Sequence, residues 1–200
     1  MNKYIFLFFS LIFSTFSVFS DQVDAIDYKN YKSPYYNFFV EIPAGTKEKW
    51  EVNKTNGKLE VQKNRKGKRI INFISYPGNY GFIHQTIADD GDPLDVIDLE
   101  PSAARGSTTP VNIIGGLYFK DKKEVDIKLI AINPTGSFQN IKNIDDLLYE
   151  HSSITEILKL WFLNYKKPGK MVFIKYLNKA DSKDIIEQAH LKWRENFNTK

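Results

Sequence analysis

The 200-residue chain contains no cysteine and only three histidines. Without cysteine it cannot hold a disulfide framework, a thiol nucleophile or a cysteine-ligated zinc ion. The histidines are scattered without metal-ligand spacing, so we interpret them as surface histidines or as histidines satisfied by hydrogen bonds. Neither a Gly-x-Ser-x-Gly nor a P-loop pattern occurs, and no internal repeat or low-complexity linker is present. These absences exclude the usual nucleophile arrangements and favour one domain.

The composition indicates a soluble domain with ample material for a core. Hydrophobic residues make up 42% of the chain and aromatic residues 14%. The formal net charge of +4 is a modest excess, too small to indicate a nucleic-acid-binding protein by itself. A chain of this length accommodates a single domain plus a leader.

The longest hydrophobic run lies in the first twenty residues. Lys3 is followed by an apolar stretch from Tyr4 to Phe13 and by a small-residue ending at Ser20. This pattern predicts a signal peptide over residues 1–20 and a single domain over residues 21–200. Because serine and threonine interrupt the run, a retained anchor is the weaker alternative. We therefore expect export to the periplasm or the extracellular space, with the cytoplasm as the alternative.

Short strands precede the helices along the chain. An Asn-Gly pair at residues 56–57 predicts a hairpin. A capping box at Ser153–Glu156, followed by an apolar stripe, predicts a helix that ends near residue 166, and a second helix is expected over residues 185–197. This order predicts an α+β fold, a small antiparallel OB-like β-barrel with two main C-terminal helices. The predicted strands cover residues 35–42, 49–52, 59–62, 69–75, 96–99, 111–117, 126–132 and 171–176.

Residues 89–98 contain five aspartates and no basic residue. Such crowding is repulsive unless a cation neutralises it, and oxygen-only ligands select hard divalent ions. Asp90 and Asp92 alternate as they would on one face of an extended strand, and Asp95 follows a turn at Pro93. An EF-hand fails on register, because Asp95 occupies the position of the turn glycine. The run predicts a site for Mg²⁺ or Ca²⁺, with an acidic surface turn as the alternative.

The segment from Asp90 to Val96, Asp-Gly-Asp-Pro-Leu-Asp-Val, resembles the signature of the soluble family I inorganic pyrophosphatases. Further pieces of the family pattern follow in order: Glu41-Ile42-Pro43-Ala44, Lys49-Trp50-Glu51, Tyr76-Pro77-Gly78-Asn79-Tyr80-Gly81-Phe82, Asp121 with Asp126 and Lys128, and Tyr165-Lys166. The resemblance implies metal-dependent hydrolysis of inorganic pyrophosphate to two orthophosphates by direct attack of metal-bound water. It also implies a homo-oligomer, a hexamer in the bacterial members.

The same resemblance assigns roles to individual residues. It implies that Asp92 is the general base. The implied metal ligands are Asp90, Asp95, Asp121, Asp126, Glu41 and Glu51. The implied phosphate-binding groups are Lys49, Arg69, Tyr80, Lys128, Tyr165 and Lys166, with Lys170 as an additional donor.

Three further positions are less constrained by the pattern. Either Arg65 or Arg69 can supply the family's phosphate-binding arginine, and Arg69 is favoured because its predicted strand leads to Tyr76. We expect Asp89 to be an accessory or surface acid. Asp98 is expected to face solvent.

Two other functions compete with the enzyme. An exported divalent-cation-binding module could keep the aspartates without turnover, but it would have no use for phosphate donors. An OB-like barrel could bind single-stranded nucleic acid, but the acidic cluster would repel a polyanion. We therefore expect pyrophosphate as the partner and no nucleic acid.

Overall fold

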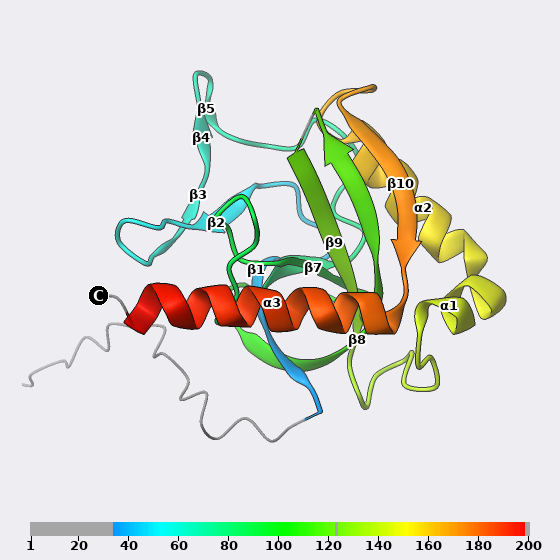
Figure 1. Ribbon diagram of the computed structural model, residues 1–200. Helices are drawn as coiled ribbons and strands as arrows, with labels where there is room; N and C mark the ends of the chain where they lie inside the picture. Colours follow the sequence, from blue (N-terminus) through cyan, green and yellow to red (C-terminus); the bar gives the residue numbers. More distant parts are fainter. Residues whose placement is uncertain (1–33, 123, 199–200) are drawn as a thin grey trace, which may run out of the picture.

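The computed structural model describes residues 34–122 and 124–198 (Figure 1). The predicted signal peptide lies outside these residues. Within them, no helix combines the length and the apolar character that crossing a membrane requires.

A closed ring of strands forms the centre of the molecule. Its sheet runs in the order β1-β6-β7-β9-β8-β10, and β1 also pairs with β8, which closes the ring. The pairing is antiparallel except between β7 and β9, which are parallel. The predicted α+β class with a small barrel is therefore confirmed, with one parallel pair in the ring. The bounds are β1 Tyr36–Ile42, β6 Asn79–Ile83, β7 Asp95–Asp98, β8 Thr108–Asp121, β9 Glu124–Ile132 and β10 Met171–Leu177.

The longest strand, β8, bends to serve both sides of the ring. Its N-terminal part pairs with β1 and its C-terminal part with β10. The register with β9 shifts between Ile113 and Gly115, where a bulge increases the local bend. A Cβ on Gly115 would lie 2.6 Å from the carbonyl oxygen of Leu177, so the close approach requires glycine.

Two small hairpins project from the barrel on one side (Figure 1). The first, β2 Trp50–Val52 with β3 Leu59–Val61, is the predicted Asn-Gly hairpin. The second, β4 Lys63–Asn64 with β5 Gly67–Lys68, carries Arg65 at its tip. The predicted strand over residues 69–75 is wrong, since only Ile70 makes an isolated bridge, to Glu48. The segment has the composition of a strand, but it pairs with a neighbouring segment only around Ile70.

The helices cover the barrel on two sides. Helix α1, Ile144–Glu150, was not predicted, although Asn143 and Asp146 form a capping box at its start. Helix α2 spans Ser152–Asn164. Its predicted capping box is wrong, because His151 is the N-cap and Glu156 pairs with Lys159. Helix α3, Lys179–Asn198, begins earlier than expected and runs across the barrel (Figure 1).

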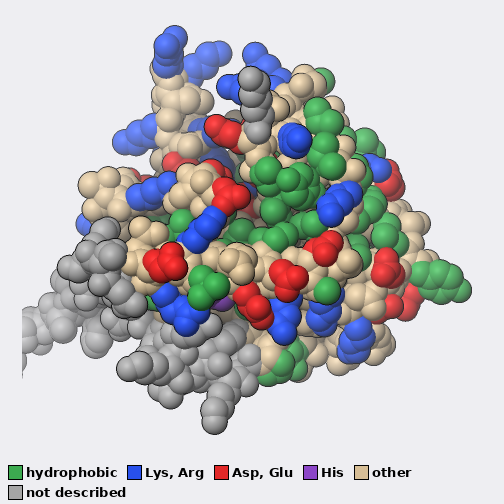
Figure 2. All heavy atoms as spheres, in the orientation of Figure 1, with side chains coloured by type: hydrophobic (Ala, Val, Ile, Leu, Met, Phe, Trp, Pro, Cys, Tyr) green, Lys and Arg blue, Asp and Glu red, His purple; other side chains and the backbone are tan. Residues whose placement is uncertain are grey.

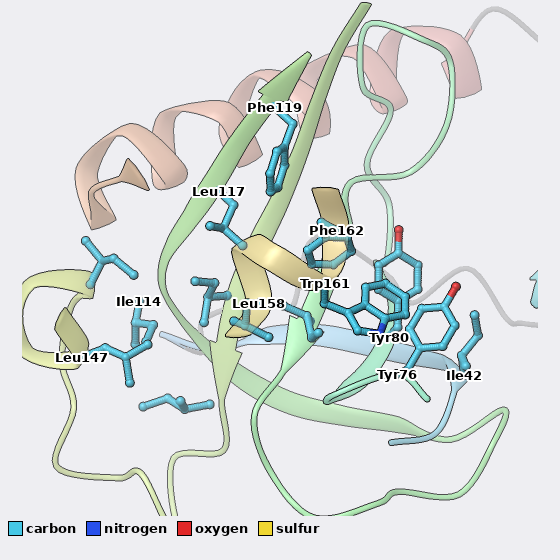
Figure 3. Packing of buried hydrophobic residues seen from close by; sticks show 14 of the residues in the cluster. Ile42, Tyr76, Tyr80, Ile114, Leu117, Phe119, Leu147, Leu158, Trp161 and Phe162 are labelled. Carbon is cyan, nitrogen blue, oxygen red and sulfur yellow. The ribbon is translucent and has the colours of Figure 1, made fainter. Parts of the chain in front are cut away.

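Two apolar clusters fill the space between these layers. One lies under α3 and includes Ile186 and Ala189, and the other lies between the barrel and α2. In the second cluster Trp161 packs against Tyr76, with ring centroids 4.5 Å apart, and its indole nitrogen donates to the Ile74 carbonyl (Figure 3). Tyr76 is 2% exposed, so it is a core residue. These aromatic rings form an apolar floor at one end of the barrel.

Asp98 does not face solvent as predicted. It is 4% exposed, because β7 lies between β6 and β9 in the ring. The side-chain amide of Asn79 donates to its carboxylate over 2.9 Å. Burial raises the pKa of Asp98 to about 6, more than the bond from Asn79 lowers it. Asp98 is therefore a structural acid whose charge destabilises the fold at neutral pH.

We predict that Asp98→Asn removes a pH dependence from stability. A carboxyl whose pKa is higher in the folded than in the unfolded state stabilises the fold below pH 4 and loses this contribution as the pH rises through 6. The stability of the variant relative to wild type should therefore rise by up to about 3 kcal/mol between pH 4 and pH 8. Urea unfolding at both pH values measures it. A difference that does not change with pH would contradict the assignment.

Candidate active site

A cleft of about 750 Å³ lies between the β2–β3 hairpin and the aspartate-rich segment. Strands β1 and β2 contribute from one wall, and the segment from residue 90 to 95 contributes from the other. The predicted site residues that line it are Glu41, Lys49, Glu51, Asp90, Asp92 and Asp95. Residues far apart in the sequence are thus brought to one surface.

Lys128 connects the predicted acid of β9, Asp126, to this cleft. The parallel pairing of β7 with β9 puts Val96 opposite Leu129, so Asp95 and Lys128 become neighbours. The Lys128 ammonium pairs with the Asp95 carboxylate and, over 2.5 Å, with that of Asp126. Lys128 therefore stands between two predicted metal ligands.

Lys166 continues the same chain of charges. Its ammonium pairs with Asp121 over 2.8 Å and lies 3.9 Å from Asp126. Tyr165, just after α2, stacks on Trp161 at 4.6 Å with an interplanar angle of 10°. Acids and lysines thus alternate from Asp95 through Asp126 to Asp121.

The buried charges of this chain stabilise one another. Lys128 is 3% exposed; burial alone would lower its pKa, but Asp95 and Asp126 raise it well above its usual value. Burial would raise the pKa of Asp95, but the charges of Lys128 and Lys49 outweigh it and lower the pKa. Both groups are therefore charged at neutral pH, and each needs the other.

Two tyrosines supply neutral donors beside these charges. The Lys49 ammonium lies 5.1 Å from the ring centroid of Tyr80, and the Tyr80 hydroxyl helps to lower the pKa of Asp95. Burial raises the pKa of Tyr80 and also that of Tyr165. Both hydroxyls therefore keep their protons and can donate hydrogen bonds at neutral pH.

Glu41 connects the barrel to the first hairpin. Its carboxylate is 7% exposed and accepts from the backbone N–H of Val52 over 2.8 Å. Burial raises its pKa to about 7, although Lys49 lowers it. The positive charge of Lys49 therefore does not fully offset the cost of burying this carboxylate.

Glu51 and Arg69 meet through Gln62. The Gln62 amide donates to Glu51 over 3.0 Å, and its carbonyl oxygen accepts from the Arg69 guanidinium. Arg69 is half-buried at the base of the β4–β5 hairpin, whereas Arg65 is exposed at its tip. Arg69 is not among the residues that line the cleft, but its partner Gln62 is.

Asp90 and Asp92 lie in a turn, which corrects the prediction of an extended strand. Asp90 accepts from the backbone N–H of Asp92 over 2.9 Å, and Gly91 has a φ of 81°. The positive φ reverses the chain at glycine, so alternation no longer decides which way the acids point. Asp92 pairs with Lys54 across the cleft, while Asp89 pairs with Lys192 of α3.

The donor set fits a hard divalent cation, but its members are not gathered around one point. Among residues 34–122 and 124–198, no three acidic or histidine side chains stand close enough to hold a metal ion. Asp90, Asp95 and Asp126 do line one smaller cavity of about 270 Å³ under α3. Lysine ammoniums neutralise Asp92, Asp95, Asp126 and Asp121 in this arrangement. All donors are oxygens, as Mg²⁺ and Mn²⁺ prefer.

Sequence reasoning missed several residues that line the cleft or support its walls. The Arg105 guanidinium lies 4.3 Å from the ring centroid of Trp50 and donates to the Glu41 carbonyl over 3.3 Å, which fixes β1 against β2. Gln62 shares a strand face with Glu60, and that alternation could have placed it in the cleft. Lys54 and Lys63 also line the cleft, but neither carries a sequence signal that separates it from a solvated lysine.

We predict that Lys128→Met destabilises the metal-free protein by about 3–5 kcal/mol, because Asp95 and Asp126 would lose their shared cation. Urea unfolding in a chelator measures the change. Lys175→Met is the matched control, since Lys175 is exposed on β10 and its pair with Asp181 is long at 3.8 Å. Equal, small effects in both variants would show that the buried pairs contribute little.

Comparison with known proteins identifies the relatives of the chain. The family model for inorganic pyrophosphatase matches residues 38–194. The inorganic pyrophosphatase of Nanoarchaeum equitans is 36% identical over 162 residues, covering 76% of this chain and 92% of the relative. That of Aquifex pyrophilus is 39% identical over 158 residues, covering 74% and 82%.

Solved structures agree with these sequences. The inorganic pyrophosphatase of Schistosoma japonicum superimposes with a TM-score of 0.77 at 27% identity, covering 83% of this chain and 68% of that one. The Helicobacter pylori enzyme superimposes with a TM-score of 0.69 at 28% identity, covering 80% and 94%. With the match over most of its length, the chain belongs to the family of soluble inorganic pyrophosphatases.

Proposed function

We propose that this protein hydrolyses inorganic pyrophosphate to two orthophosphates, with Mg²⁺ as the divalent cation and Mn²⁺ as a possible substitute. The observation that carries the proposal is the alternation of acids and lysines that starts at the cleft with Asp95 and runs through Lys128 and Asp126 to Lys166. Cation binding alone needs carboxylates, and phosphate binding alone needs cations. A site that holds both suits a metal–pyrophosphate complex.

The acids have separable tasks in this proposal. Asp90, Asp95, Asp121, Asp126, Glu41 and Glu51 would hold divalent cations, which neutralise the phosphates and make water a better nucleophile. Asp92 would accept the proton of the attacking water. It is exposed at the cleft and its partner Lys54 is also exposed, so water and solvent ions can compete for its carboxylate.

The cations and tyrosines would bind the substrate. The ammoniums of Lys49 and Lys128 lie 5.1 and 5.7 Å from the Tyr80 ring centroid, so both would serve a phosphate bound beside Tyr80. Lys166 and Tyr165, at the end of α2, would stabilise charge on the leaving phosphate. Direct attack by water on phosphorus breaks the bridging P–O bond, and the leaving oxygen keeps the electron pair. No covalent phosphoenzyme is needed.

Arg69 is the arginine that we propose for phosphate binding. Its half-buried position and its bond to Gln62 hold the guanidinium at the edge of the cleft, with further N–H groups available for a phosphate. The exposed Arg65 at the hairpin tip has no such support.

Export with removal of residues 1–20 and assembly as a hexamer also remain proposals from the sequence. Exposed apolar side chains on α2 and β10, among them Leu160 and Val172, are compatible with self-association. The N-terminal residue of the protein purified from cells and its mass in solution decide both.

The test of the function is phosphate release from pyrophosphate with and without Mg²⁺. We predict metal-dependent release by wild type and a loss of kcat of roughly 10²–10⁴-fold in Asp92→Asn, the range for a lost general base. Asp89→Asn is the matched control, because Asp89 belongs to the same turn but pairs with Lys192 of α3. Its rate should stay close to wild type. If the wild-type protein released no phosphate, the enzyme function would be refuted in favour of the cation-binding module.

A second prediction concerns the arginines. Arg69→Ala should lower kcat/KM for pyrophosphate by roughly 10- to 100-fold, the size of a lost charged hydrogen bond. Arg65→Ala, in the same hairpin, should leave it unchanged because its side chain is exposed at the tip. Initial rates over a pyrophosphate series at fixed free Mg²⁺ give both values. The reverse ranking of the variants would exchange the two roles.

A further inference from the structure

The β4–β5 hairpin carries charge that pyrophosphate hydrolysis does not use. Between Glu60 and Asp89 the chain has no acidic residue, and all five of its basic residues there fall within residues 63–69. Residues 63–68 are exposed, so their side chains add nothing to the core. Figure 2 shows lysine and arginine side chains gathered on this projecting part of the molecule, at the upper left.

Three of these charges, those of Lys63, Arg65 and Lys66, are not neutralised within the described part of the chain. Lys68 lies 3.9 Å from Glu48, but no described carboxylate stands within ion-pair distance of Lys63, Arg65 or Lys66. The turn of the hairpin nevertheless has a defined conformation, since the Asn64 side chain accepts a hydrogen bond from the backbone N–H of Lys66 over 2.8 Å. A fixed turn that presents uncompensated cations is suited to an anion.

The hairpin is continuous with the cleft. Lys63, its first residue, lines the cleft, and Arg69 closes the hairpin with a main-chain bond to Gln62. Two strand residues rise by roughly 7 Å, so the tip lies just beyond the rim. A line of cations therefore leads from Lys49 and Lys54 in the cleft, through Lys63, to Arg65 and Lys66 outside it.

We propose that this line binds a linear inorganic polyphosphate, with one end of the chain in the cleft and the following phosphates along the hairpin. The part concerning the cleft rests on the proposed function. The cleft measures about 750 Å³ and is lined by Lys63, which begins the exposed hairpin, so a polyanion longer than pyrophosphate could continue from the cleft onto it. Single-stranded nucleic acid is the weaker fit, because residues 62–72 contain no aromatic side chain on which a base could stack.

The test measures binding of end-labelled long-chain polyphosphate by fluorescence anisotropy, in Mg²⁺ and in an Asp92→Asn background that suppresses turnover. The double variant Arg65→Gln/Lys66→Gln removes the tip charges and leaves Asn64 and Gly67 in place. We expect its Kd for long chains to rise roughly tenfold and the slope of log Kd against log salt to fall by about 0.7 for each lost contact. Binding of tripolyphosphate, which is too short to reach the tip, should not change.

The matched control is Lys175→Gln/Lys183→Gln, which removes the same charge from β10 and α3. Long-chain binding that is equally weak in the control, or unchanged in the tip variant, would overturn the proposal. So would equally tight, tip-dependent binding of single-stranded DNA of matched charge. Pyrophosphate hydrolysis is measured separately in the Asp92 wild-type background, where the tip variant should match wild type. An inactive wild type would refute the proposed function and leave the anisotropy result to decide polyphosphate binding at the hairpin.

Discussion

The buried ammonium of Lys128, placed between Asp95 and Asp126, is the interaction on which the rest of the site depends. Each of these groups would be costly to bury alone, and their mutual attraction offsets that cost. The pairing exists because β7 and β9 run parallel and in register, which puts Asp95 beside Lys128. The single parallel pair in an otherwise antiparallel ring thus creates the contact that joins the two halves of the acid–lysine chain.

The aromatic floor explains why the charges stay close together. Tyr80 and Phe162 lie beneath Lys128, and Tyr165 stacks on Trp161. These rings exclude water from one side of the charged groups, and a lower local dielectric strengthens the interactions among them. Trp161 is itself fixed by its bond to Ile74, so α2 is locked to the segment that precedes Tyr76. Fold and site therefore share the same side chains.

Much of this could be predicted from the sequence, and the failures have identifiable causes. The strands of the ring were predicted except β6, whose Pro-Gly-Asn start was interpreted as the end of the preceding strand, and the motif residues were placed by resemblance. Asp98 was misplaced because its sequence neighbours do not reveal that β7 lies inside the sheet with Asn79 beside it. The strand at residues 69–75 was predicted from composition, which cannot supply the partner that a ladder needs. The prediction that Asp90 and Asp92 share a strand face was wrong because Gly91 has a positive φ. The chain turns there, so side chains no longer alternate as in a strand.

The lysines of the site differ in burial. The more exposed a lysine is, the more easily its ion pair breaks and frees the partner aspartate for another ligand. The Lys54 side chain is 68% exposed, that of Lys166 is 26% exposed and that of Lys128 is 4% exposed. An exposed ion pair contributes little and is screened by salt, whereas a buried one is costly to break. Lys54 can therefore leave Asp92, the proposed general base, most readily, and a divalent cation can displace Lys128 from Asp95 least readily. The buried pair keeps the two halves of the site in register while the exposed pair opens to solvent, so one acidic cluster is stable before it binds cations and still able to bind them.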